Sequence, residues 1–526
     1  MRFLVAAAWV AVLTGGVAFE AIAAKTAAES RDQAVLDRIF DDAMERYGLP
    51  GMAMGVIEDG EVTYARASGE TVAGSGDPVT PATLFKIASN SKAMTAAVLA
   101  RQVDAGKLRW DDPVVKHLPQ FRMHDPWVTR EMQVRDLLIH NSGLPEGAGD
   151  LMLWPEPNHF DRDDIIAGLA HLKPERSFRS GYAYDNLLYV VAGEVAAAVG
   201  GKDYESLVRS ELFEPLGLSD CRVGEWSRDE AGSVAQPHMR TDEGNVAIRV
   251  DGETVPAITS AAAGGVRCSL DDMLAWGRNW LVPTREQLRW LSSKQREAMW
   301  TPHTILPLPR RSREWDGTHI RAYGYGWRLA DVDGEWTVSH TGTLSGMYSV
   351  LMLLPDRRSG FVVMINGNGS AARTVLTSTL LKYFTRRDET VDVAHYAGLL
   401  ESDRSGAGAS RVPDTSSRKP ARVLDLQAYL GTWRDPWFGE VRLCRQDDDV
   451  RFVSSKSPRL SGRLMRVRER HLVEWDDSTV DLEPWVDFKP PGPGRSARMT
   501  MAKVDPDGDF SSDYEDLDFV RVGGCG

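Results

Sequence analysis

The stretch from Thr83 to Ala100, TLFKIASNSKAMTAAVLA, contains a serine, Ser89, three residues before a lysine, Lys92. Alanine, methionine and leucine are good helix formers, so the stretch predicts a helix that begins at or near Ser89. The positions that follow Lys92 are apolar nearly all round, which favours a buried helix. Side chains three residues apart project from one helix face, so we expect Ser89 and Lys92 to lie close together.

The pairing of Ser89 with Lys92 predicts an activated nucleophile. Burial disfavours the charged form of an amine and therefore lowers its pKa. A readily deprotonated amine beside a hydroxyl is a base beside a nucleophile, the serine–lysine form of nucleophilic catalysis. The same spacing occurs at Ser416 and Lys419, but in a polar stretch with Pro420 directly after it and no apolar helix. We therefore predict that Ser89 is the nucleophile.

The composition is that of an ordinary globular protein with an acidic balance. Of the 526 residues, 42% are hydrophobic and 26% are charged, which is the usual range. The net charge of -13 argues against nucleic acid and anionic membranes as partners. The sequence contains no His-x-x-x-His pair and no Cys-x-x-Cys pair. It therefore predicts no metal site and no cofactor.

The first 24 residues are typical of a secretory signal. Arg2 precedes an apolar run from Phe3 to Val12, and the segment ends in small residues. Glu20 disfavours a spanning helix, and a retained membrane anchor is the alternative interpretation. We expect a cleaved signal over 1–24, a secreted or periplasmic protein, and no stable membrane insertion.

The four cysteines are scattered along the chain, at Cys221, Cys268, Cys444 and Cys525. An oxidising compartment would permit Cys221–Cys268 or Cys444–Cys525 bridges. The spacing of the cysteines does not decide their pairing, so the disulfide pattern stays open at this point.

Helical and strand patterns predict an α/β (α+β) domain over 31–390. Arg31 to Tyr47 has helical spacing, and Gly51 to Glu70 has the pattern of two strands joined by a turn. Trp336 to Asn366 contains three further strands, and Ala371 to Arg386 is a closing helix. These patterns favour one antiparallel sheet flanked by helices, with a large helical insertion between its strands.

The last part of the chain has a different pattern. Residues 402–420 are polar and poor in apolar side chains, which indicates a linker. Residues 421–526 contain seven or eight short strands, several of them separated by turn signals. This pattern predicts a small all-β barrel or sandwich.

Two further motifs accompany the nucleophile. Tyr184-Asp185-Asn186 is the only Tyr-x-Asn of the chain and lies in a loop before an apolar helix. His340-Thr341-Gly342 is the only His-x-Gly and lies on a predicted strand. In this order, Ser-x-x-Lys, Tyr-x-Asn and His-Thr-Gly resemble the serine β-lactamase and penicillin-binding-protein superfamily, with contexts most similar to its class C-like branch of S12 peptidases and esterases. The resemblance covers roughly Arg31 to Arg386.

The resemblance implies a role for each motif residue. Ser89 would attack an acyl carbonyl and form an acyl-enzyme. Lys92 would hold the proton network and lower the pKa of Tyr184, which would pass a proton to and from the leaving group. Asn186 would bond Lys92 and the amide of the substrate. The backbone N–H groups of Ser89 and Thr343 would form the oxyanion hole.

The third motif bears on the choice of substrate. His340, Thr341, Gly342 and Thr343 would bind the substrate, and Gly342 would keep the strand open to its backbone. His340 replaces the lysine common in β-lactamases, and a neutral imidazole offers a substrate carboxylate only a hydrogen bond. We therefore expect poor β-lactamase activity. The His-Thr-Gly form resembles that of esterases and D-amino-acid-specific peptidases.

The C-terminal segment, beginning LDLQAYLGTWRDPWFGEVRL, is similar to the lipocalin-like domain that follows the catalytic domain in some S12 peptidases. Tyr429, Gly431, Thr432 and Trp433 fit its opening strand. The resemblance leaves open whether this domain caps the cleft or contributes to a homo-oligomer.

The sequence as a whole favours a secreted serine hydrolase acting on small peptides or esters, including peptides with D-residues. The alternatives are a β-lactamase and a catalytically silent module that binds peptidoglycan fragments. The presence of both Ser89 and Lys92 disfavours the silent module. The chain has no Gly-x-Ser-x-Gly, which disfavours an α/β-hydrolase.

Overall fold

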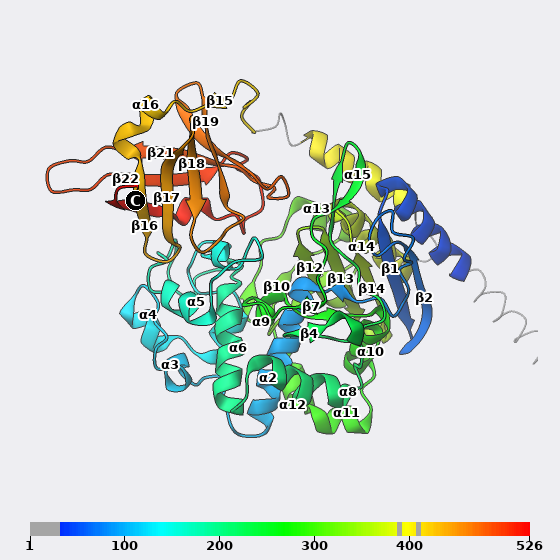
Figure 1. Cartoon of the computed structure of the whole chain (residues 1–526). Helices are drawn as coiled ribbons and strands as arrows, with labels where there is room; N and C mark the ends of the chain where they lie inside the picture. Colours follow the sequence, from blue (N-terminus) through cyan, green and yellow to red (C-terminus); the bar gives the residue numbers. More distant parts are fainter. Residues whose placement is uncertain (1–31, 387–391, 407–411, 526) are drawn as a thin grey trace, which may run out of the picture.

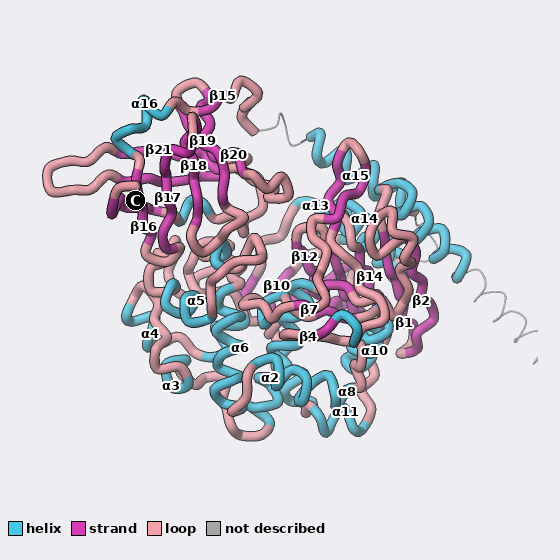
Figure 2. Tube along the Cα trace, viewed as in Figure 1, coloured by secondary structure: helices cyan, strands magenta, loops and turns pink. Residues whose placement is uncertain are grey.

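An eight-stranded antiparallel sheet organises the first part of the chain in the computed structural model (Figure 1, Figure 2). The structure describes residues 32–386, 392–406 and 412–525, so the predicted signal over 1–24 lies outside the described residues. The strand order is β2-β1-β14-β13-β12-β11-β10-β9. The strands are β1 (Gly51–Glu58), β2 (Glu61–Gly69), β9 (Thr304–Ile305), β10 (Arg321–Tyr323), β11 (Arg328–Val332), β12 (Glu335–Leu344), β13 (Met347–Leu354) and β14 (Ser359–Ile365).

Helices cover both faces of this sheet. Successive side chains of strand β1 point to opposite faces and are apolar on both, so each face needs a covering layer. Met52 and Met54 pack with Phe40, which belongs to a helix over 32–47. On the other face, Ala53 packs in the core that includes Leu274. The covering helices are 32–47, α14 (Ser370–Thr385) and α15 (Val393–Gly406) on the first face and α10 (Leu270–Leu281) on the second. This arrangement confirms the predicted α/β (α+β) class with an antiparallel sheet flanked by helices.

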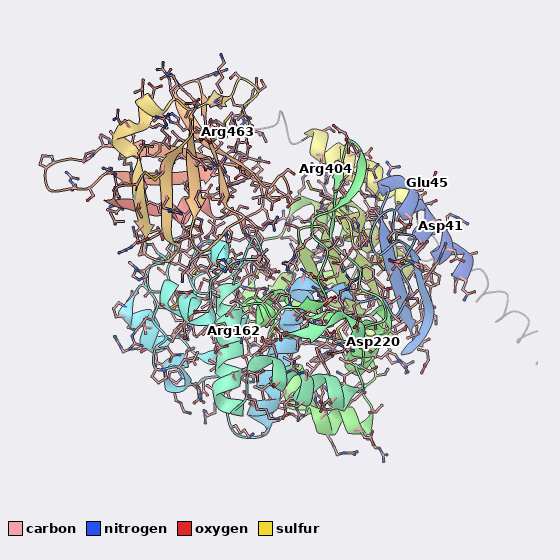
Figure 3. The ribbon with its side chains drawn as sticks, viewed as in Figure 1. Asp41, Glu45, Arg162, Asp220, Arg404 and Arg463 are labelled. Atoms are coloured by element: carbon pink, nitrogen blue, oxygen red, sulfur yellow. A yellow bond between two sulfur atoms is a disulfide. The ribbon has the colours of Figure 1, made fainter. Side chains whose placement is uncertain are left out.

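The helix over 32–47 shows the amphipathic pattern that positions these layers (Figure 3). Asp41 and Glu45 are exposed on its outer side, whereas Phe40 and Ala43 are buried against the sheet. Apolar residues three and four apart form one stripe, so a single helix face can enter the core.

The predicted insertion lies between β2 and β9 and is mainly helical (Figure 1). Its centre is formed by α2 (Ser91–Asp104) and α6 (Leu187–Gly200), which are largely buried and pack on each other. Its other α-helices are α3 (Val114–His117), α4 (Pro126–Glu131), α5 (Arg162–Gly168), α7 (Tyr204–Val208), α8 (Glu214–Leu216), α9 (Ala261–Gly264), α11 (Arg285–Trp290) and α12 (Ser293–Met299).

Short elements complete this part of the chain. The strands are β3 (Phe85–Lys86), β4 (Trp226–Ser227), β5 (His238–Thr241), β6 (Gly244–Ala247), β7 (Thr254–Val255) and β8 (Arg267–Cys268). The one-turn helices are η1 (Ala88–Asn90), η2 (Val134–Leu138), η3 (Asp150–Met152), η4 (Arg209–Phe213), η5 (Arg228–Glu230) and η6 (Pro355–Arg357). Helix α13 (Arg310–Asp316) lies between β9 and β10.

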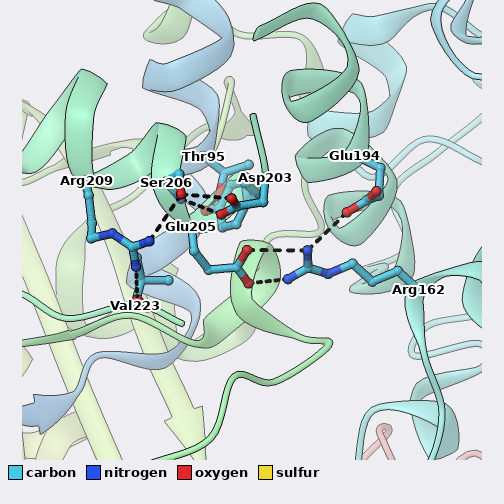
Figure 4. A network of polar contacts seen from close by, with 9 residues as sticks. Thr95, Arg162, Glu194, Asp203, Glu205, Ser206, Arg209 and Val223 are labelled. Atoms are coloured by element: carbon cyan, nitrogen blue, oxygen red, sulfur yellow. Dashed lines mark hydrogen bonds and ion pairs between the residues drawn. The ribbon is translucent and has the colours of Figure 1, made fainter. Parts of the chain in front are cut away.

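An ion-pair network braces the outer side of the insertion (Figure 4). Arg162 of α5 pairs with Glu205 of α7, and its Nη1 lies 3.2 Å from Oε1 of Glu194 on α6. The hydroxyls of Tyr204 on α7 and Thr95 on α2 are 2.7 Å apart. The network therefore ties three helices to the buried helix α2.

Strands β16 to β23 form a closed β-barrel at the C-terminal end of the chain (Figure 1). The ring closes because β19 pairs with β20 as well as with β18. The strand pattern alone left a barrel or a sandwich open, the resemblance to a lipocalin-like domain predicted a small all-β barrel, and the structure confirms the barrel. The barrel strands are β16 (Gly431–Asp435), β17 (Gly439–Gln446), β18 (Asp449–Ser454), β19 (Ser461–Val467), β20 (Arg470–Trp475), β21 (Pro484–Lys489), β22 (Arg498–Lys503) and β23 (Asp518–Gly523). The same part of the chain contains the short strand β15 (Lys419–Pro420) and the short helices α16 (Val423–Leu426), η7 (Gln427–Tyr429) and η8 (Tyr514–Asp516).

The segment predicted to be a linker, 402–420, has structure at both ends. Helix α15 continues to Gly406, because its earlier turns pack Tyr396 and Leu400 into the core beside the sheet. Strand β15 adds Lys419 and Pro420 to the edge of β19. Residues 407–411 lie outside the described residues, so the domain boundary within 402–420 stays a prediction.

Both disulfide pairings that the sequence allowed are present. Cys221 is bonded to Cys268 within the insertion, and Cys444 is bonded to Cys525 across the barrel. Among the helices that the structure describes, none is long and apolar enough to cross a membrane.

Candidate active site

Ser89 lies in the one-turn helix η1, directly before the buried helix α2. The helix therefore begins where the sequence predicted. Ala88 has φ of +49°, in the left-handed region that few non-glycine residues adopt. Backbone in this region is strained and concentrates at functional sites. The turn leaves Ser89 partly exposed to a pocket, whereas Ser416 lies exposed on a polar segment.

Lys92 is completely buried beside Ser89. Its Nζ lies 3.1 Å from Ser89 Oγ, 2.7 Å from Asn186 Oδ1 and 2.8 Å from Ala263 O. The last two are carbonyl oxygens that can only accept, so a neutral amine must donate to both of them. The remaining lone pair then faces the hydroxyl of Ser89.

Burial also sets the protonation of this amine. Loss of solvation lowers the pKa of Lys92 from 10.5 to about 7, although Asp150 raises it. A large share of the amine is therefore neutral near pH 7. This confirms the direction of the shift that the apolar helix predicted.

Tyr184 and Asn186 lie in the loop that leads into α6, as the sequence predicted. The Tyr184 ring is 4.8 Å from Lys92 Nζ and 4.2 Å from the His140 ring, and it lines the pocket. Burial raises the pKa of the Tyr184 phenol above its usual range, although Arg328 and the Ser89 hydroxyl pull it down. The expected lowering of this pKa is therefore outweighed by desolvation, and the phenol is protonated at neutral pH.

His340 lies on β12 but is completely buried, and both ring nitrogens are engaged. Nδ1 donates to Thr341 O at 2.7 Å, so Nε2 accepts from Tyr323 Oη at 2.8 Å. Burial and the nearby cations Arg328 and Lys92 hold the pKa of His340 well below its usual range. The imidazole is therefore neutral, and the neighbouring Thr341 and Thr343 line the pocket instead.

Gly342 permits a close contact between β12 and the nucleophile turn. A Cβ at this position would lie 2.2 Å from Ile87 O and 2.3 Å from Ser349 Oγ. The missing side chain would thus clash with the backbone next to Ser89. The glycine is needed for this packing, and the approach of a substrate backbone at Gly342 stays a prediction.

Arg328 is a pocket residue that the sequence motifs did not single out. It begins β11, and its Nη1 donates to Thr341 Oγ1 at 3.1 Å. Its Nε is buried without a hydrogen-bond partner, and no carboxylate among the described residues pairs with it. A partly buried cation without a carboxylate partner is costly to desolvate, which points to a role towards a substrate or a reacting group.

The pocket beside Ser89 has a volume of about 310 Å³. It lies between the part of the chain that contains the large sheet and the insertion (the catalytic part) and the barrel. The catalytic part contributes Ser89, Tyr184, Asn186, Arg328, Thr341 and Thr343, and the barrel contributes Arg459, Asp481, Asp509, Phe510 and Ser511. The barrel residues are a second group that the sequence analysis missed. Within the described residues, no three His, Cys, Asp or Glu side chains converge as a metal site would require.

Comparisons with known proteins agree with this geometry. A family model described as beta-lactamase matches residues 36–383. The esterase EstB of Burkholderia gladioli is 29% identical, over 63% of this chain and 89% of its own. The unguisins hydrolase ungD' of Aspergillus campestris is 24% identical, over 77% of this chain and 76% of its own. The octameric penicillin-binding protein homologue from Pyrococcus abyssi has the same fold, with a TM-score of 0.56 at 19% identity over 92% of this chain and 99% of its own.

Proposed function

Because the chain belongs to the beta-lactamase family, we propose that it hydrolyses small peptides or esters through an acyl-enzyme on Ser89. The observation that carries the proposal is the position of the Lys92 amine, whose Nζ lies 3.1 Å from Ser89 Oγ, so that its neutral form can accept the Ser89 proton. An activated nucleophile of this kind has a base within hydrogen-bond reach, itself oriented by a third group. Here Asn186 and the Ala263 carbonyl orient the base.

The proposed reaction begins with transfer of the Ser89 proton to Lys92 Nζ. The oxygen then attacks the carbonyl carbon, and the N–H groups of Ser89 and Thr343 hold the developing oxyanion. Tyr184, which is protonated at rest, donates its proton to the leaving alcohol or amine, and Lys92 replaces that proton. Water then cleaves the acyl-enzyme by the reverse transfers and releases the acid.

A substrate panel tests this function. Purified protein would be assayed with p-nitrophenyl esters and with D- and L-aminoacyl p-nitroanilides. Turnover of esters alone favours an esterase, and turnover of D-aminoacyl anilides favours a peptidase for D-residues. If the protein hydrolyses no substrate of the panel and Ser89 is not acylated, the proposal is contradicted.

The pH dependence of turnover provides a sharper expectation. The reactive form has a neutral Lys92, whose pKa is about 7. We therefore expect kcat for an ester to rise with pH through about 7, since deprotonation creates the base. A profile measured between about pH 5 and 9 that stays flat across neutrality would exclude Lys92 as the base.

A second candidate function, β-lactam hydrolysis, is favoured by Arg328. This guanidinium lines the pocket and has no carboxylate partner among the described residues. It could supply the fixed positive charge for a substrate carboxylate that the neutral His340 lacks.

We nevertheless expect esters to be preferred over a chromogenic cephalosporin. Both nitrogens of His340 are engaged, so the charge-assisted bond from this strand, worth ~1.5–3 kcal/mol, is missing. The difference in kcat/KM should be at least about tenfold. If the cephalosporin is hydrolysed as fast as the esters and Arg328→Gln selectively raises its KM, Arg328 carries the charge and the second function holds.

We also propose that the protein acts in a secreted or periplasmic setting. The Cys221–Cys268 and Cys444–Cys525 bridges support an oxidising compartment. A homo-oligomer stays part of the proposal, because the fold is shared with a homologue described as octameric.

A further inference from the structure

A segment of the barrel enters the catalytic part of the chain beside Ser89. The Phe510 ring packs edge-on against the Tyr184 ring, with the ring centroids 5.7 Å apart. A Cβ on Gly147 would lie 2.6 Å from Phe510 O, so this approach requires the glycine. Asp513 accepts from the N–H groups of Gly149 and Leu151, at 2.5 and 3.1 Å. The insertion and the barrel are thus joined by backbone and side-chain contacts on both sides of Asp150.

Asp150 connects this segment with the catalytic amine. Its Oδ2 accepts from Ser511 Oγ at 2.7 Å and from Asn186 Nδ2 at 2.8 Å. Asn186 Oδ1 in turn accepts from Lys92 Nζ at 2.7 Å. All three side chains from Asp150 to Lys92 are buried. A continuous chain of hydrogen bonds therefore runs from the barrel to the amine that faces Ser89.

The orientation of the Asn186 amide depends on this chain. Its carbonyl and amino ends are nearly the same size, so only hydrogen-bond partners decide which end faces Lys92. Asp150 Oδ2 accepts from the amino end of Asn186, which leaves the carbonyl end facing Lys92. Ser511 donates to the same oxygen of Asp150 and so holds it in place.

We propose that Ser511 of the barrel is a positioning residue for catalysis, which acts through Asp150 and Asn186 to hold the Lys92 amine on Ser89. The inference rests on the proposed function at Ser89. The family match ends at residue 383 and so assigns no role to the barrel. Residues of both parts of the chain line the pocket, and the barrel completes the catalytic site.

The test compares Ser511→Ala with Ser511→Thr, which retains a hydroxyl. Ser511→Ala should lower kcat for the best ester by about 10- to 100-fold, as small displacements of catalytic groups do, with KM changed by less than about twofold. Ser511→Thr should restore most of kcat. Ser461→Ala, on barrel strand β19 and outside the described pocket lining, serves as the matched control and should behave as the wild type.

Two outcomes would overturn the inference. One is a Ser511→Ala variant with the kcat of the wild type, and the other is a loss that Ser511→Thr does not restore. If Ser511→Ala unfolds at a lower temperature, Asp150→Asn decides instead, since it preserves the shape of the side chain and should lower kcat in the same way.

The rate of Ser89 acylation by a fluorophosphonate probe separates this inference from the proposed function. If the wild type does not react with the probe and hydrolyses no substrate, the proposed function fails and the inference fails with it. If the wild type reacts and Ser511→Ala reacts equally fast, only the inference fails. Slower labelling of Ser511→Ala than of Ser461→Ala supports both.

Discussion

The Ser89→Ala variant is expected to form no acyl-enzyme and to lose on the order of 10⁴–10⁶ in kcat. The substitution removes the one hydroxyl that lies 3.1 Å from Lys92 Nζ, so neither nucleophile nor proton donor remains. Ser89 is partly exposed at the edge of the pocket, and a methyl group fits in its place. Substrate binding and thermal unfolding should therefore stay close to those of the wild type.

Intact-mass spectrometry after treatment with a serine-directed acylating probe measures this effect. The wild type should gain one adduct and Ser89→Ala none. Ser416→Ala is the matched control, because Ser416 has the same spacing to a lysine but lies exposed outside the pocket. It should gain the adduct as the wild type does. A full adduct on Ser89→Ala would remove the basis of the hydrolase assignment.

Lys92→Met is expected to lower kcat by about 10²–10⁴ while the protein stays folded. Methionine has a similar length but no basic nitrogen, so the Ser89 proton has no acceptor at this position. The rings of Tyr184 and Tyr189, whose centroids lie 4.8 and 5.1 Å from Lys92 Nζ, suit a thioether. The loss should appear in the acylation step, measured by the rate of probe labelling.

The same variant also tests the pKa of Lys92 through stability. The folded protein holds this pKa at about 7, below the 10.5 of the unfolded chain. Between these values the unfolded state binds more protons, so Lys92 makes stability rise as the pH increases. The stability of the wild type relative to Lys92→Met should therefore increase from about pH 7 to about pH 10. A constant difference across this range would mean that the pKa of Lys92 is not lowered.

These expectations change the meaning of the third motif. The neutral His340 is hydrogen-bonded to Tyr323 and to the backbone of Thr341 and does not line the pocket. A charged group that lines the pocket is Arg328 of the neighbouring strand β11. In the proposed function, electrostatic recognition of substrate would therefore depend on Arg328 of β11, while β12 contributes Thr341 and Thr343 to the pocket lining. Assays of Arg328 variants would measure the contribution of β11 to substrate binding separately from that of β12.

Much of the fold was predictable because it follows from local patterns. Alternating apolar residues predicted the strands of Trp336 to Asn366, and the apolar run after Lys92 predicted α2. The strand pattern alone predicted only a barrel or a sandwich, because short strands do not reveal whether β19 and β20 pair to close the ring, and the barrel was predicted from the resemblance to a lipocalin-like domain. The linker was predicted from polarity, yet α15 enters it, because a helix anchored by Tyr396 and Leu400 can continue into polar residues.

The sequence by itself pointed to the proposed nucleophile, its amine and the two accompanying motifs, because each is defined by residues one to three positions apart. Only the tertiary structure decided that His340 is buried, that Nε of Arg328 has no hydrogen-bond partner, and that Ser511 reaches Asp150. Ser511 and Asp150 are 361 positions apart in the chain, and no local periodicity encodes such a contact. It arises when the barrel docks on the insertion, and the protonation of the site follows from the burial that this packing creates.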